Sequence, residues 1–129
     1  MTSTQNLALF IAMLLATLFV VRASLFISPF SNLNIGPYNT HHLFLGAFLL
    51  VVVVIFLIIG ISNKLVIMLA GVASALVVDE IIYLIATDGS DLAYLTPVSF
   101  WGAVALTLVV LLTAGVAHRV AAVTKRKEV

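Results

Sequence analysis

Four long apolar segments dominate the sequence, and polar residues gather in the three short stretches between them. The segments cover about 6–27, 37–62, 64–86 and 97–120. Each has at least the roughly 20 residues that an α-helix needs to cross the hydrocarbon core of a bilayer. Backbone groups in lipid must find hydrogen-bond partners within their own segment, so we expect a helix in every case, even at the β-branched run 51–54.

Composition places this chain in a bilayer rather than in water. Of its 129 residues, 64% are hydrophobic and 9% are charged, and the mean hydropathy is +1.30. A soluble domain of this length could not bury so much apolar surface. The net charge of +1 gives no footprint for nucleic acid, and the lack of cysteine excludes disulfides and thiolate metal sites. We predict one integral membrane domain over residues 1–129.

The connections between the segments indicate how the helices are arranged. Residues 62–64 leave room only for a tight turn, so the second and third spans should be antiparallel neighbours. Pro37 and Pro97 suit the first turn of a helix, where the missing N–H costs nothing. Asp88 and Gly89 form a turn signal before the fourth span. The expected fold is all-α, a four-helix transmembrane bundle.

Basic residues predict the orientation of the bundle. They gather in the second connection, at Lys64, and at the carboxyl end, at Arg119, Lys125, Arg126 and Lys127. By the positive-inside rule, both the N- and the C-terminus are then cytoplasmic. The aromatic residues Tyr94 and Trp101 fit a belt at the outer surface of the membrane.

Most ionisable side chains within the spans fall at a similar depth. Counted from the turn at 62–64, the pair Asp79 and Glu80 lies roughly 23 Å above it, and the pair His41 and His42 roughly 30 Å. Arg22, counted from the start of the first span, lies at roughly 24 Å. Charged groups at such depths face the interior of a bundle and find partners there. We therefore expect one polar cluster in the outer part of the bundle.

The first interpretation of this cluster is structural. Arg22 neutralises one carboxylate at matching depth, and Tyr38 or Tyr83 donates a hydrogen bond to the other. The histidines then bond to neighbours at the wet mouth of the bundle. Buried ion pairs of this kind often specify helix register rather than add stability.

The second interpretation is a transition-metal site for redox or hydrolytic chemistry. His41, His42, Asp79 and Glu80 offer the imidazole and carboxylate ligands that zinc, iron, manganese or copper accept, with Tyr83 behind them. Adjacent helical residues point about 100° apart, so neither pair binds one ion easily. Side chains also lean toward the start of their helix, which separates the two pairs, and no Glu-x-x-His spacing occurs.

A third interpretation is an oligomeric proton or ion transporter that uses the same residues. Such a path needs a continuous polar line to the cytoplasm. The inner half of the spans offers only Ser74, Thr107 and Thr113 for it.

The stretches "THHLFLG", "ALVVDEIIYLI" and "SDLAYLTPVS" together resemble a group of small, uncharacterised prokaryotic integral membrane proteins. The matching positions are His41, His42, Gly46, Asp79, Glu80, Asp91, Tyr94, Pro97 and Ser99. The resemblance covers about the middle three quarters of the chain. It implies a prokaryotic cell membrane and a capping or bridging role for Asp91 at the outer mouth, against the simpler reading of a solvated loop charge. It names no reaction.

The leading functional expectation is a non-catalytic accessory or structural component of a membrane complex. Its expected partners are the lipid bilayer and other membrane subunits or further copies of the chain, with no nucleic acid. Whether the chain also has an enzymatic activity stays open at this stage, as does a bound transition metal.

Overall fold

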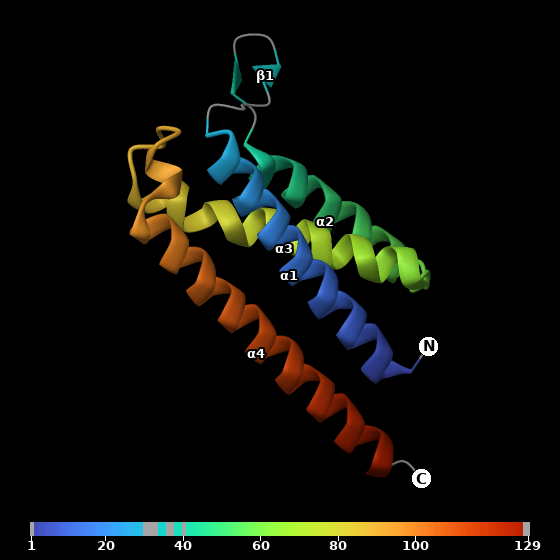
Figure 1. Ribbon diagram of the computed structural model, residues 1–129. Coiled ribbons are helices and arrows are strands. Elements are labelled where there is room, and N and C mark those ends of the chain that lie inside the picture. The colour runs from blue at the N-terminus through green and yellow to red at the C-terminus, as the bar shows by residue number, and fades with distance from the viewer. Residues whose placement is uncertain (1, 30–33, 36–37, 40, 128–129) are drawn as a thin grey trace.

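A computed structural model describes residues 2–29, 34–35, 38–39 and 41–127, with side chains described for 2–29 and 41–124. Four helices account for most of the chain (Figure 1). They are α1 (Ser3–Ile27), α2 (His42–Ile58), α3 (Lys64–Ala86) and α4 (Pro97–Lys127), with a 3₁₀ turn η1 (Ala93–Leu95) before α4. The prediction of an all-α, four-helix fold is confirmed.

Three of the helices, α1, α3 and α4, are long and apolar enough to cross a membrane. The second predicted span is wrong at both ends, because α2 has only 17 residues instead of covering 37–62. At its start, β1 (Asn34–Ile35) pairs with β2 (Tyr38–Asn39) in a small antiparallel hairpin, which sequence reasoning missed. Residues that precede the apolar run can satisfy their backbone N–H and C=O groups between two strands, so they need not form a helix. Pro37 lies outside the described residues.

The helix ends follow local capping rules. Thr2 and Gln5 form a reciprocal capping box, so α1 begins three residues earlier than predicted. Gly60 has φ +82°, a left-handed conformation that ends α2 before the predicted residue 62. Asn63 accepts a hydrogen bond from the Val66 N–H at 3.1 Å and starts α3. The tight turn between α2 and α3 is therefore present, and α4 continues beyond the predicted residue 120.

Helix α3 forms the centre of the bundle, and the other three helices all pack against it. Each crossing holds one glycine. A Cβ on Gly46 of α2 would lie 2.8 Å from the Ala73 carbonyl oxygen of α3, and a Cβ on Gly71 of α3 would lie 2.6 Å from the Phe10 oxygen of α1. A Cβ on Gly102 of α4 would meet Ile82. Close approach through small residues is the usual means of packing helices in lipid.

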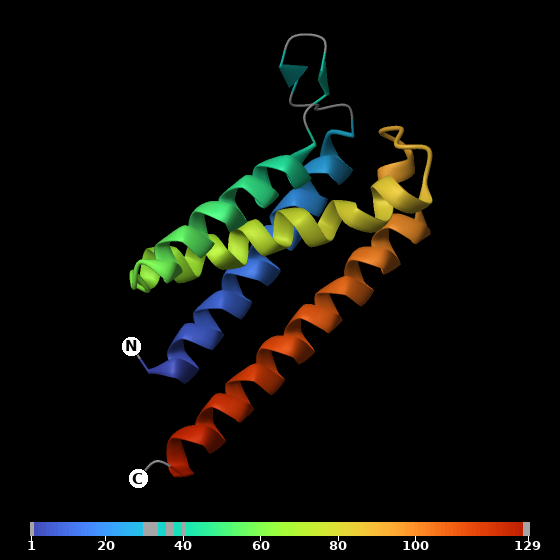
Figure 2. The same ribbon diagram turned by 180° about the vertical axis from the view of Figure 1, so that it is seen from behind.

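The two chain ends lie on one side of the bundle, together with the turn between α2 and α3 (Figures 1 and 2). The β-hairpin and the connection from α3 to α4 lie at the opposite end. This arrangement is the one expected for an even number of passes through a membrane. It brings the first turns of α2 and α4 near the last turns of α1 and α3, where the ionisable residues are found.

Candidate functional site

Six side chains from four elements meet at the loop end of the bundle, and we call them the carboxylate cluster. They are Arg22 of α1, His41 and His42 at the start of α2, Asp79 and Glu80 of α3, and Tyr94 of η1. Asp79 and Glu80 are almost fully buried, at 1% and 4% exposed. Burial of two adjacent carboxylates in an apolar bundle requires that both find strong partners.

Asp79 has three side-chain partners. Arg22 Nε donates to Oδ1 at 2.6 Å, so the ion pair expected from their depths is present. On the other oxygen, Oδ2, His42 Nε2 lies at 3.1 Å and the Tyr94 hydroxyl donates a hydrogen bond. Burial, and next the Asp79 charge, raise the pKa of Tyr94 far above its usual range. The phenol therefore keeps its proton and acts as a donor.

Arg22 ties α1 to three other elements at this end of the bundle. Its Nη2 donates to the carbonyl oxygens of Asp79 at 3.1 Å and Ser99 at 3.2 Å, and its Nη1 donates to the Tyr94 carbonyl at 3.2 Å. The guanidinium carbon also lies 4.3 Å from the centre of the Tyr94 ring. The planar guanidinium group thus joins α1 to α3, η1 and α4. The compact ammonium group of a lysine could not reach all of these acceptors at once.

Glu80 caps the first turn of α2 from the neighbouring helix. Its Oε2 accepts the Leu43 N–H at 2.7 Å, while His41, the N-cap residue, makes no side-chain cap of its own. A carboxylate at this position also suits the positive end of the helix dipole. The start of α2 is therefore completed by a residue of α3.

The histidines both reach Glu80, although sequence reasoning placed them too far apart. His41 Nδ1 lies 3.1 Å and His42 Nδ1 3.4 Å from the same oxygen, Oε1. The expected separation of 100° assumed two helical residues, but His41 has an extended backbone with ψ 138° and precedes α2. His42 stands between the two carboxylates, with Nε2 3.1 Å from Asp79 Oδ2 and Nδ1 3.4 Å from Glu80 Oε1.

The other residues expected in the cluster have different positions. The Tyr83 hydroxyl donates to the Gly89 carbonyl at 2.6 Å, so of the two predicted donors to a carboxylate, Tyr38 or Tyr83, it is not Tyr83. The Tyr83 ring packs edge-on against Tyr94 at 5.3 Å. Tyr38 belongs to β2, and its side chain lies outside the described residues. Asp91 is half-buried in the turn before η1.

Tyr94 is the functional residue that sequence reasoning missed. It belongs to the "SDLAYLTPVS" stretch, yet its aromatic character predicted a place in the membrane belt. The 3₁₀ turn η1 instead directs it inward, where it is 5% exposed. The signal available in the sequence was its place just before Pro97, the residue at which α4 begins.

The metal interpretation is not supported by the geometry. Among the described residues, no group of three or more His, Cys, Asp or Glu side chains is arranged to hold a metal ion. The four proposed ligands do come together, but as hydrogen-bonded pairs that aim their polar atoms at each other. The carboxylates of Asp79 and Glu80 also accept hydrogen bonds from Arg22, from Tyr94 and from the backbone of α2.

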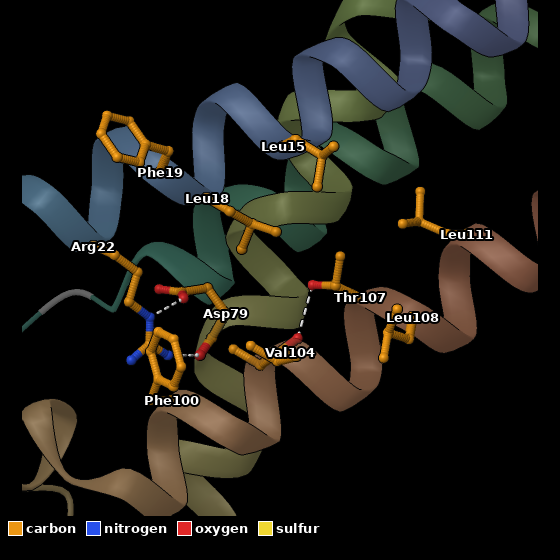
Figure 3. Close-up of a pocket in the computed structure, with 11 residues that line it drawn as sticks. Leu15, Leu18, Phe19, Arg22, Asp79, Phe100, Val104, Thr107, Leu108 and Leu111 are labelled. Atoms are coloured by element: carbon orange, nitrogen blue, oxygen red, sulfur yellow. Dashed lines mark hydrogen bonds and ion pairs between the residues drawn. The ribbon is translucent and has the colours of Figure 1, made fainter.

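Two adjoining hollows line the seam between α1 and α4. The inner one, which we call the groove, measures about 360 Å³ and has Arg22 and Asp79 at one end (Figure 3). Its remaining lining is Leu15, Leu18, Phe19, Phe100, Ala103, Val104, Thr107, Leu108 and Leu111. The outer one, the mouth, measures about 580 Å³ and shares Phe19, Arg22 and Phe100 with the groove. Arg22 is therefore the polar side chain that lines both hollows, and its partner Asp79 lies on the groove side.

Ser99 and Tyr94 together test which buried hydroxyl groups contribute to stability. Ser99 is fully buried, and within the described part of the chain its Oγ has no hydrogen-bond partner. We expect Ser99→Ala to leave the free energy of unfolding unchanged or to raise it by about 1 kcal/mol, because no hydrogen bond is lost. Tyr94→Phe removes one oxygen as well, but from the donor to Asp79, and should lower it by about 1.5–3 kcal/mol. Denaturation of both variants in detergent, followed by circular dichroism, checks the contrast; equal losses would contradict it.

Comparison with known proteins adds no assignment: no protein-family model, no curated protein and no solved structure matches this chain. The resemblance to small prokaryotic membrane proteins therefore stays a prediction.

Proposed function

We propose that this protein is a non-catalytic accessory or structural component of a membrane assembly in a prokaryotic cell membrane, with both termini in the cytoplasm. The observation that supports this function is the saturation of the carboxylate cluster. All four carboxylate oxygens of Asp79 and Glu80 have a donor or an imidazole nitrogen within 3.1 Å. A catalytic carboxylate instead needs a free oxygen facing a substrate.

The inner half of the bundle favours this role over transport. The buried Thr107 hydroxyl donates to the Ala103 carbonyl at 2.7 Å, and the Thr113 hydroxyl donates to the Val109 carbonyl at 2.8 Å. Both groups are thus occupied within their own helix. They give a proton or an ion no line of polar groups from the cluster to the end where the termini lie.

The outer faces of the helices supply surfaces for partners. Large apolar side chains on α1, α2 and α4 are more than half exposed, among them Phe19, Phe48 and Leu112. Lipid tails cover such faces by default, and a second membrane subunit or another copy of the chain could replace them through close packing. The cluster would then hold the helices in the register that this surface requires.

The absence of cysteine allows a sharp test of this function. Single variants Phe48→Cys on α2 and Leu112→Cys on α4 place one thiol on different outer faces, 65% and 69% exposed in the parent chain. After cross-linking in native membranes with a bifunctional maleimide, we expect one variant to give a defined product of higher mass and the other to stay at the mass of a single chain. A product of doubled mass would identify a homo-oligomer.

Two results would contradict the proposal. One is a protein that stays monomeric with every outer thiol and carries no partner in mild detergent. The other is a pH-dependent ion flux in liposomes that Glu80→Gln abolishes while the protein remains folded.

A further inference from the structure

The seam between α1 and α4 is closed at both of its ends and open between them. At the terminal end, Ser3 Oγ lies 3.1 Å from His118 Nδ1. At the loop end, Arg22 of α1 donates to the Ser99 carbonyl of α4. Between these contacts lies the apolar groove, with Arg22 and Asp79 at its outer end (Figure 3). The opening therefore faces sideways into the bilayer and has a limited length.

The shape of the groove fits a flexible chain better than another helix. A transmembrane helix is about 10 Å across and packs along its whole length. The polar contacts at both ends of the seam join α1 and α4 there, so the seam is open only along the groove. An acyl chain is thin enough to lie between Leu15 and Leu18 on one wall and Val104 and Leu108 on the other.

Arg22 supplies a polar end for that chain. Of its five N–H groups, four donate within the described part of the chain, which leaves one N–H on Nη1 for an outside acceptor. Asp79 already compensates the charge of the guanidinium at 2.6 Å. The acceptor that fits is consequently an uncharged oxygen rather than a phosphate.

The depth of Arg22 points to the kind of oxygen. Helix α1 has 25 residues and is roughly 37 Å long, whereas the hydrocarbon core is about 30 Å thick. Arg22 lies five residues before the end of α1, which places it close to the boundary between hydrocarbon and headgroups. Ester carbonyls of glycerolipids lie at this boundary, and Trp101 at the mouth is a typical interfacial residue.

We propose that the groove is a binding site for one acyl chain of a membrane glycerolipid, with an ester carbonyl of that lipid accepting the remaining Arg22 N–H. The headgroup lies outside the mouth and makes no charge-selective contact. The site is therefore selective for a chain and an ester, not for a headgroup. This inference does not rest on the proposed accessory function, because it concerns the lipid side of the bundle alone.

The test measures how much lipid the protein retains in detergent. The full chain is reconstituted with dioleoyl phosphatidylcholine, extracted, washed extensively and examined by native mass spectrometry and phosphorus analysis. We expect one lipid per chain, and the same result with dioleoyl phosphatidylglycerol. Val104→Phe, which fills the groove, should weaken retention by roughly tenfold, whereas the control Val109→Phe, on the exposed face of the same helix, should retain lipid normally.

A second variant and a second measurement keep the test independent of one substitution. Leu15→Phe fills the groove from the α1 wall and should also lose the lipid. In the unaltered chain, a retained lipid brominated at carbons 6 and 7 should quench Trp101, the single tryptophan. The proposal is overturned if the parent chain retains no lipid, if the filled variants retain it fully, if only the anionic lipid is retained, or if the retained brominated lipid leaves Trp101 unquenched.

Discussion

Replacing either member of the central ion pair, as Arg22→Ala or Asp79→Ala, is expected to lower the free energy of unfolding by about 3–5 kcal/mol. Either change leaves the opposite charge buried without compensation. Arg22→Ala also removes the donors to three backbone carbonyls, and Asp79→Ala removes the acceptor of Tyr94. Reversible unfolding of the detergent-solubilised protein by added denaturing detergent, followed by helicity, measures both losses.

Two controls show whether the loss comes from an unpaired charge. Arg119→Ala makes the same chemical change on an exposed residue of α4 and should have little effect. The double variant Arg22→Met/Asp79→Leu removes both charges and should cost less than the sum of the single changes, because no buried ion is left alone. If the double variant loses the full sum, the pair does not act as a unit and the interpretation of the cluster fails.

Gly71→Leu is expected to lower the free energy of unfolding by about 3 kcal/mol or more, at or beyond the upper end of the usual cost of overpacking. A Cβ at Gly71 would meet backbone atoms of α1, the Phe10 oxygen at 2.6 Å and the Leu14 nitrogen at 3.1 Å. Backbone cannot turn aside as a side chain can, so α1 would have to move away from α3. Such a movement would also pull Arg22 from Asp79.

Gly115→Leu is the matched control for this change. Gly115 lies within α4, and a Cβ there would have no atom within 4 Å apart from its chain neighbours and the backbone of its own helix. We expect its stability to be unchanged or to rise by about 0.5–1 kcal/mol, because glycine is a poor helix former. Thermal unfolding of the two variants in the same detergent separates the cost of the helix crossing from any general effect of a larger side chain. Equal destabilisation would show that Gly71 does not set the approach of α1.

The four helices could be predicted because apolar length and the need to satisfy backbone groups in lipid leave few other structures. The pairing of Arg22 with a carboxylate of α3 followed from depth, since both lie on long helices with a regular rise, but depth did not distinguish Asp79 from Glu80. The start of α2 could not be predicted in this way. Residues 37–41 are polar and lie before the apolar run, so no helix was required there, and the extended backbone of His41 turned its ring toward Glu80.

Tyr94 and the central glycines illustrate a different limit. A tyrosine in a loop after a span is typical of the membrane surface, and only the fold of η1 shows that its hydroxyl faces inward. The glycines were expected to allow close packing, but nothing in the pattern showed that Gly46, Gly71 and Gly102 each lie at a crossing with α3 and that Gly115 does not. Both facts depend on which helices meet, and periodicity does not encode that.

The cap that Glu80 provides for α2 bears on how the chain is assembled during translation. The two residues of that hydrogen bond are 37 positions apart, so all of α2 is synthesised before its cap. At 17 residues, α2 is also the shortest of the four helices and the weakest candidate to insert alone. The first turn of α2 is completed only when α3 follows. We therefore expect α2 and α3 to insert together as one helical hairpin. Helices α1 and α4 then pack against α3 in a later step.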